Sequence, residues 1–303
     1  MKIRSAALTA VLLILPLFVG AQDFEGRYKR LVERVGLCGV GVETLIENWA
    51  VAEPDDAEML TAKFNFWLTK GQGTEVVAKS EKRYLGLDPV IVLKDSSDAD
   101  VYYYEVLKYD DECFREAIAS VDRAIAMYPE HLDFRFMKAN AYLSYERESP
   151  DMALANLLSL MNDFMGGKAK WTYGEEPADE EFFAAAMQEY CVSFYTLGTS
   201  GSMEAFRKLS EEMLRHRPDD PDFMCNMGSY HMLAKKDLKA AVKYYDKVLK
   251  KHPDNYTAIK NSVLAARMSG NVKLEKKYLR MLAEHGTDSE RLQAQARLEM
   301  LQK

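Results

Sequence analysis

Four short turns that each contain a proline constrain the fold of this chain more than any other feature. Proline cannot continue the helix behind it, and the Asp or Asn that follows can cap the helix ahead, so each turn ends one amphipathic run and opens another. Pro218 and Pro253 are 35 positions apart, close to the period of about 34 residues typical of helix-turn-helix repeats. The turns are Glu53-Pro54-Asp55-Asp56, Tyr128-Pro129-Glu130-His131, Arg217-Pro218-Asp219-Asp220 and His252-Pro253-Asp254-Asn255.

The clearest repeat unit runs from Asp222 to Pro253. Its second helix is expected to place Ala241, Tyr245 and Val248 on one face, because they are spaced i, i+4, i+7. The unit resembles a tetratricopeptide repeat, although His231 stands where that family usually has tyrosine. The family's core positions are matched by Met224, Met227 and Gly228 in the first helix and by Ala241, Tyr245, Val248 and Pro253 in the second.

The same pattern of core residues and closing prolines recurs, less completely, over most of residues 40 to 285. The resemblance therefore implies an all-α superhelix, a solenoid of the tetratricopeptide type. One second helix is expected around Ala117, Val121, Ala124 and Pro129, and its first helix at 57–70. The other expected pairs are Ala139 and Tyr142 with Ala153, Leu157 and Leu160; 182–197 with 203–215; and 259–268 with 274–283, before a charged tail helix after Gly286.

Two stretches interrupt the helical period. Residues 89–93 and 101–107 are rich in Val, Ile and Tyr and are separated by a polar turn at 95–98, which predicts a β-hairpin inserted at about 71–109. The second stretch, 166–179, is a loop that carries Trp171 and Tyr173. Its aromatic side chains either contact a partner or pin the loop onto the solenoid.

The first 21 residues have the pattern of a secretory signal peptide. Lys2 and Arg4 precede an apolar run that is too short to span a bilayer, which needs about 20 apolar residues, and Ala21 ends a run of small residues suited to cleavage. We therefore expect one repeat domain at 22–303 that is exported to the periplasm or secreted and does not insert in the membrane after cleavage. An exported chain is not expected to bind nucleic acid.

Charge is distributed unevenly along the chain. Residues 22–221 hold 22 basic and 38 acidic side chains, whereas residues 222–303 hold 16 and 9. The formal balance is therefore minus 16 followed by plus 7. This pattern indicates either an ordinary solvated surface or a basic C-terminal part that attracts an acidic partner.

The sequence contains no pattern that predicts catalysis, a metal site or a cofactor. Its five histidines form no paired-ligand motif, and its glycine clusters lack the spacing of a phosphate loop. The turn with Asp95, Asp98 and Asp100 lacks the central glycine of a calcium-binding hand. Cys191 and Cys225 lie one repeat apart and are expected to be buried free thiols, although a disulfide between them stays open. We expect a binding protein and not an enzyme.

The resemblance also implies where a partner would bind. In tetratricopeptide repeats the first helices line the concave face, and their fifth and ninth positions contact peptides. Carried over, the pairs are Thr61 with Asn65, Phe136 with Asn140, Cys225 with Ser229, and Lys260 with Leu264. Because none of these pairs is the lysine and asparagine that grip a C-terminal carboxylate, a mixed groove is expected. Its candidate partner-binding residues are Asn65, Phe136, Asn140, Ser229, Met232 and Lys260.

Three functions remain open at this stage. The first is a periplasmic scaffold for protein–protein interaction, which binds a protein or peptide of unknown identity. The second is an assembly component of an envelope or secretion complex. The third is a carbohydrate binder or an unrecognised enzyme that uses the insert and the Trp171 loop. The groove residues are also compatible with having no ligand.

The export prediction can be checked by intact-mass measurement of the protein recovered from its host. We expect a mature chain that begins at Gln22, because cleavage after Ala21 places small residues at the positions that signal peptidase reads. A full-length chain recovered from the cytoplasm would contradict the prediction.

Overall fold

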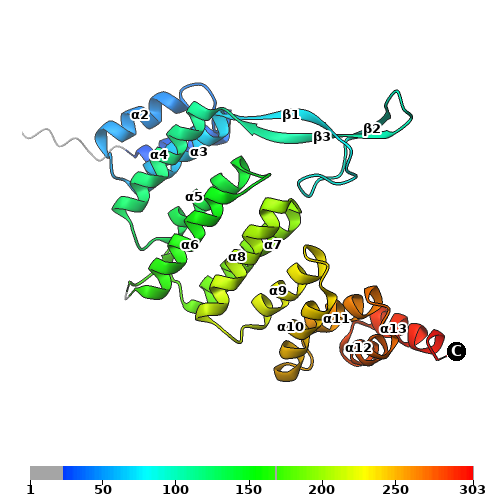
Figure 1. Cartoon of the computed structure of the whole chain (residues 1–303). Helices are drawn as coiled ribbons and strands as arrows, with labels where there is room; N and C mark the ends of the chain where they lie inside the picture. The colour runs from blue at the N-terminus through cyan, green and yellow to red at the C-terminus, as the bar shows by residue number, and fades with distance from the viewer. Residues whose placement is uncertain (1–22, 168, 303) are drawn as a thin grey trace, which may run out of the picture.

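The computed structural model describes residues 23–167 and 169–302, so the predicted signal peptide lies outside the described residues. Within them, thirteen α-helices follow one another in a curved row (Figure 1). This arrangement confirms the predicted all-α superhelix. The consecutive packed pairs are α3 (Ala57–Lys70) with α4 (Asp111–Met127), α5 (Leu132–Tyr145) with α6 (Asp151–Gly166), α7 (Glu180–Leu197) with α8 (Ser200–His216), α9 (Pro221–Leu233) with α10 (Leu238–Lys251), and α11 (Tyr256–Met268) with α12 (Val272–His285). The row begins with α1 (Phe24–Val35) and α2 (Val42–Ala52) and ends with α13 (Asp288–Met300).

Side-chain caps fix where the helices after the proline turns begin. Asp56 accepts a hydrogen bond from the backbone N–H of Met59 at 2.7 Å, and Asn255 accepts one from that of Ala258 at 2.9 Å. Asp220 caps α9 in the same way, whereas His131 makes no side-chain cap bond to α5. Three of the four turns therefore satisfy helix N–H groups that would otherwise lack partners.

The core runs through the whole row of helices. One apolar cluster extends from α1 through α8, and a second joins α9 to α13. Helix α9 contributes to both, with Phe223 and Tyr230 in the first and Cys225 and Met232 in the second. Of the residues assigned to the repeat core, Pro129 and Pro253 lie exposed in their turns, and the buried ones are Ala117, Ala124, Gly228, Ala241, Tyr245 and Val248.

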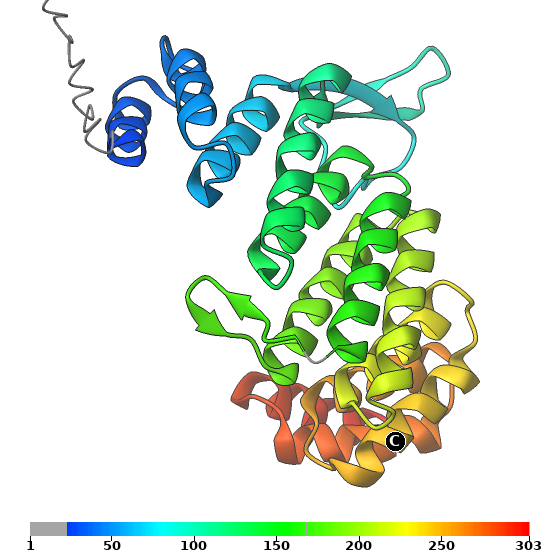
Figure 2. The ribbon, with the colours of Figure 1, turned by 90° about the vertical axis from the view of Figure 1, so that its left-hand side faces the viewer.

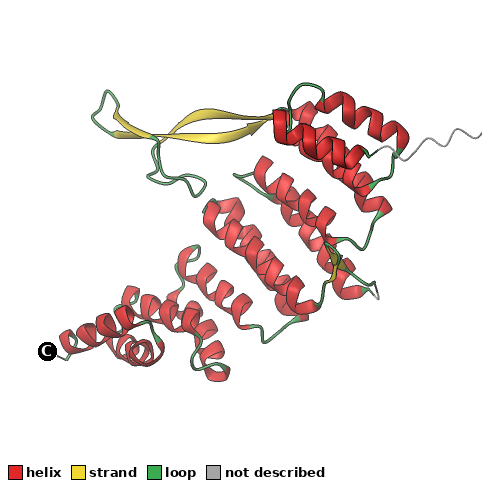
Figure 3. Ribbon diagram, turned by 180° about the vertical axis from the view of Figure 1, so that it is seen from behind, coloured by secondary structure: helices red, strands yellow, loops and turns green. Residues whose placement is uncertain are grey.

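A three-stranded antiparallel sheet lies between α3 and α4 and projects from the helices (Figure 3). The predicted strands are β2 (Ile91–Lys94) and β3 (Asp100–Tyr109), and Leu93 pairs with Val101 in their hairpin. The additional strand, β1 (Gln72–Lys79), pairs along the other edge of β3 and was not predicted. Its first five residues are exposed, so they lack the apolar alternation by which a half-buried strand is recognised.

The insert returns to the solenoid through residues 80–90 and docks on the turns inside the second and third helix pairs. The guanidinium of Arg147 donates a hydrogen bond to the carbonyl oxygen of Leu85 at 3.0 Å, and the hydroxyl of Tyr84 donates to Glu148. Leu85 is buried in a small apolar cluster with Leu197. The insert of the first pair is therefore held by residues of the next two pairs.

A second, smaller hairpin lies between α6 and α7, formed by β4 (Thr172–Tyr173) and β5 (Glu176–Pro177) (Figure 2). Trp171, just before it, is only 7% exposed and packs on Phe164 at 5.7 Å between ring centroids. The backbone N–H of Gly174 donates to the carboxylate of Asp133 at 2.8 Å. Two roles were predicted for the aromatic residues of this loop, contact with a partner and attachment of the loop to the solenoid. Trp171 has the second role.

Cys191 and Cys225 are both buried and neither forms a disulfide. The thiol of Cys191 lies 3.4 Å from the hydroxyl of Ser210, and burial raises the pKa of both thiols to about 12. The thiolate form that reacts or binds metals is thus scarce at neutral pH.

The close packing where α9 crosses α10 lets us predict the effect of adding one methyl group. A Cβ at Gly228 would lie 2.4 Å from Cε1 of Tyr245, whose ring is fully buried. Gly228→Ala should therefore lower the free energy of unfolding by about 1 to 3 kcal/mol, measured by chemical denaturation.

Gly166→Ala is the matched control for this substitution. Gly166 also lies in a helix, but an added Cβ there meets nothing within 4 Å. The control should be neutral or stabilise the protein by up to about 1 kcal/mol, because alanine favours helix. Equal destabilisation by both changes would contradict the packing described for Gly228.

Candidate functional site

The first predicted contact region, on α5, is already occupied by other parts of the chain. Phe136 is only 8% exposed, and its ring centroid lies 6.1 Å from that of Tyr173 and 5.9 Å from that of Tyr190. Tyr173 comes from the β4–β5 hairpin, which the repeat pattern did not predict. Phe136 therefore cannot act as an exposed anchor, whereas Asn140 on the same helix is exposed and Asn65 on α3 is half-buried.

The predicted contact residues on α9 serve the interior. Met232, which was expected to meet a ligand, is only 2% exposed and belongs to the core. The hydroxyl of Ser229 lies 3.2 Å from that of Tyr245 and accepts a hydrogen bond from Asn261 at 3.3 Å. The hydroxyl of Ser229 therefore links α9 to α10 and α11.

Lys260 on α11 is engaged by the C-terminal helix. Its ammonium group lies 3.2 Å from Glu290 of α13 and donates to the hydroxyl of Tyr256 at 3.0 Å. The hydroxyl of Tyr256 also donates to Glu290 at 2.5 Å, and these bonds together with those from Thr287 lower the pKa of Glu290 to about 2. The Lys260 side chain, at which a peptide contact was expected, is therefore paired with α13, although it stays exposed.

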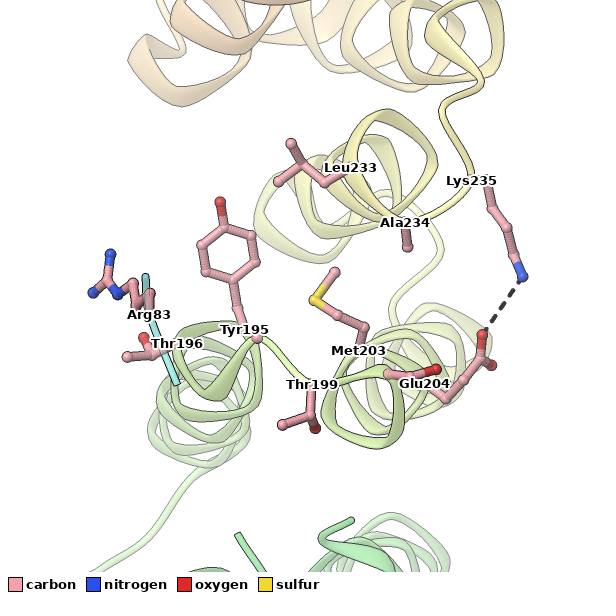
Figure 4. Close-up of a pocket in the computed structure, with 11 residues that line it drawn as sticks. Arg83, Tyr195, Thr196, Thr199, Met203, Glu204, Leu233, Ala234 and Lys235 are labelled. Atoms are coloured by element: carbon pink, nitrogen blue, oxygen red, sulfur yellow. Dashed lines mark ion pairs between the residues drawn. The ribbon is translucent and has the colours of Figure 1, made fainter. Parts of the chain in front are cut away.

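An open cleft of about 600 Å³ lies instead where the C-terminal ends of α7 and α9 meet the start of α8. Figure 4 shows the ring of Tyr195 pointing toward Leu233, with the side chain of Met203 directed into the space between them. Tyr195 is 43% exposed, and the other two are partly buried. These three side chains give the cleft an apolar floor contributed by three helices.

Charged side chains form the rim of the cleft. Lys235 lies 3.7 Å from Glu204 on one wall, and Arg83 of the insert lies on the other side of Tyr195 (Figure 4). Hydrogen bonds from Tyr230 and Arg207 hold the pKa of the Glu204 carboxyl below its usual range. Contact with the Tyr230 hydroxyl, followed by the charge of Glu204, raises the pKa of Lys235. The rim therefore presents both signs of charge at neutral pH.

Local sequence sets the geometry of the turn beneath the cleft. Gly198 ends α7 with a φ of 68°, a left-handed conformation that glycine adopts without strain. Thr199 then begins α8 through a reciprocal capping box with Ser202. The hydroxyl of Thr199 also donates to the carbonyl oxygen of Glu148 at 2.6 Å, which ties this turn to the preceding helix pair.

The insert completes the cleft wall by close backbone approach. Gly86 has a φ of 74°, and a Cβ added there would lie 2.7 Å from the carbonyl oxygen of Thr196. Sequence reasoning missed the cleft because Arg83 and Tyr195 are brought together only by this docking. The repeat pattern of the sequence does not indicate that the insert docks there.

Other proposed kinds of site receive less support from the geometry. Asp95 accepts hydrogen bonds from Ser97 and Ala99 within its own turn, and Asp100 pairs with Lys94 at 2.8 Å. In residues 23–167 and 169–302, no cluster of three or more His, Cys, Asp or Glu side chains is placed to hold a metal ion. Over the same residues, no helix is both long enough and apolar enough to cross a membrane.

Comparison with known proteins adds only a likeness of fold. No protein-family model matches this sequence, and no curated protein matches it. The crystal structure of MamA protein is similar over 57% of this chain and 82% of that one, with 15% identity and a TM-score of 0.34. That of PilW, a widely conserved type IV pilus biogenesis factor, is similar over 90% of this chain and 99% of that one, with 11% identity and a TM-score of 0.38. At such low identities and TM-scores, neither carries information about partners.

If the insert is docked on the solenoid at Gly86, a substitution that disrupts this contact should change the rate of proteolysis. Gly86→Val should separate the insert from Thr196, because its side chain would clash with a backbone oxygen. Trypsin cleavage after Lys82 and Arg83 should then be faster by about tenfold or more, since cleavage follows local opening of a segment. Timed digestion with mass spectrometry measures both rates.

Gly174→Ala is the control for backbone strain. Gly174 also has a positive φ, 58°, but an added Cβ there meets nothing within 4 Å. This variant should leave cleavage after Arg83 unchanged. If Gly86→Val is cut no faster than the parent protein, the insert is not held at Thr196.

Proposed function

We propose that this protein is an exported helical-repeat scaffold that binds a segment of another protein in the cleft floored by Tyr195, Met203 and Leu233. The observation that carries the proposal is this cleft, because it exposes apolar side chains on rigid helices within a rim of both charges. Export rests on the signal pattern of residues 1–21.

The composition of the cleft suits a protein ligand. Binding energy at protein interfaces is concentrated in aromatic and arginine anchors surrounded by polar contacts. Tyr195 is such an aromatic side chain, and Arg83 reaches the same cleft from the insert. Glu204 and Lys235 can pair with side chains or backbone groups of an extended segment. The cleft is open to solvent, so it can admit part of a longer chain.

Catalysis is not part of the proposal. The lining contains neither histidine nor cysteine, and its one carboxylate, Glu204, is engaged by Tyr230, Arg207 and Lys235. A carbohydrate platform on Trp171 is disfavoured because that ring is buried. The second candidate function, a component of an envelope assembly, is supported by the opposite formal charges of the two parts of the chain.

Site-specific photo-cross-linking tests the proposal in the producing cell. Tyr195 is replaced by benzoylphenylalanine, and an otherwise identical protein carries the cross-linker at Val51, which is 85% exposed and far from the cleft in sequence. We expect a protein adduct from position 195 and none of the same mass from position 51. The adduct identifies the partner for a binding measurement.

Substitutions then show which side chains contribute to the affinity for this partner. Tyr195→Ala combined with Leu233→Ala should weaken binding of that partner by more than about 1 kcal/mol, as expected when interface anchors are truncated. The control combines Val92→Ala and Leu93→Ala, which removes exposed apolar side chains from β2 of the insert. If the control abolishes binding while the cleft variant binds normally, the insert is the site and the cleft proposal is wrong.

A further inference from the structure

The outer side of α10 carries a row of exposed lysines, with Asp246 at one edge of the row. Lys239, Lys243, Lys247 and Lys250 are all exposed and lie within an arc of about 80° on the helix. They extend along about 16 Å of the helix axis. The opposite side of α10 holds the buried residues Ala241, Tyr245, Val248 and Leu249. The lysines therefore point away from the core.

In the described part of the chain, Lys239, Lys243 and Lys250 form no ion pair with the nearby acidic groups. Asp246 is the only acidic residue in α10, and its carboxylate binds Lys277 at 2.8 Å and the hydroxyl of Tyr278 at 3.0 Å. Among the residues that the structure describes, no ion pair joins a carboxylate to Lys239, Lys243 or Lys250.

Helix α12 extends the basic surface. The contacts of Asp246 with Lys277 and Tyr278 bring α10 and α12 together at this point. Lys273 and Arg280 are exposed on α12, while the buried carboxylate of Glu275 faces inward to Arg267 and Arg297 at 3.2 and 2.9 Å. Glu284 is the acidic residue that stays exposed near the end of α12. We call the exposed basic residues of the two helices the basic face, defined by Lys239, Lys243, Lys247, Lys250, Lys273 and Arg280.

The composition of the basic face favours a lipid surface over a protein partner. Interfaces between proteins are depleted in lysine at their centres and depend on buried aromatic or arginine anchors. Val272 is the one large apolar residue of α10 and α12 that is exposed, and Tyr244 is stacked on His231 with 5.4 Å between ring centroids. Lysine is a hydrated point charge on a flexible stem, which suits a layer of mobile phosphate groups without fixed geometry.

We propose that the basic face of α10 and α12 docks the protein peripherally on membranes that contain anionic phospholipids. The contact is electrostatic and inserts no helix. Charge near such a surface is worth about 1 kcal/mol per basic residue, or about fivefold in affinity. Several residues acting together therefore give measurable binding, although the chain as a whole is acidic.

Vesicle co-sedimentation of the purified protein tests the proposal. We expect binding to phosphatidylcholine vesicles that contain phosphatidylglycerol and none to pure phosphatidylcholine. Binding should decline as salt is raised from about 0.05 to about 0.5 M, because exposed charges are screened. No binding to the anionic vesicles at low salt would overturn the proposal.

Matched variants distinguish binding through the basic face from binding that depends only on net charge. Replacing Lys239, Lys243 and Lys250 by Gln should lower the affinity for anionic vesicles by at least about tenfold, with an unchanged melting temperature. Replacing the same three by Arg should retain binding. The control replaces three lysines exposed elsewhere by Gln, namely Lys82, Lys170 and Lys208, and should bind like the parent protein.

Two outcomes would overturn the assignment. Equal losses in the two Gln variants would mean that only net charge matters. Binding to soluble polyglutamate but not to anionic vesicles would mean that the face recognises an acidic protein.

Discussion

Close approach of the two helices within a unit is the contact on which the rest of the structure depends. At the crossing of α9 and α10, Gly228 leaves space that the buried ring of Tyr245 fills. A helix pair cannot bury its apolar faces alone, so each pair needs neighbours on both sides. The final pair is covered by α13, whose Glu290 binds Lys260 and Tyr256. That ending pairs Lys260, a predicted contact residue, with another part of the same chain.

The insert adds a long-range constraint to this chain of neighbour contacts. It leaves the solenoid at the end of α3 and returns at α4, yet it is fixed by Glu148 and Thr196 in later pairs. The turns inside these pairs lie along the same side of the row, so a segment inserted at the first turn can cross the next two. Its close contact with Thr196 brings Arg83 to the ends of α7 and α9. The cleft is therefore a product of tertiary docking and not of the repeat itself.

This difference explains what sequence reasoning could predict. The bounds of α3 at 57–70 and the interruption before α4 followed from local periodicity and proline position. Strand β1 and the β4–β5 hairpin were missed because they are short or exposed and lack alternation. Phe136 and Met232 were assigned to a groove by repeat position, but Tyr173 covers the first and the core takes the second. Position within a repeat identifies a helix face, whereas insertions decide whether that face stays open.

The uneven charge of the chain also favours one part of the protein for the proposed membrane contact. Residues 22–221 carry a formal minus 16 and residues 222–303 plus 7, so an anionic surface repels the first part and attracts the second. The cleft lies at the ends of α7 and α9, whereas the basic face lies on the side of α10 opposite its buried residues. A partner segment in the cleft therefore need not compete with lipid for the same side chains.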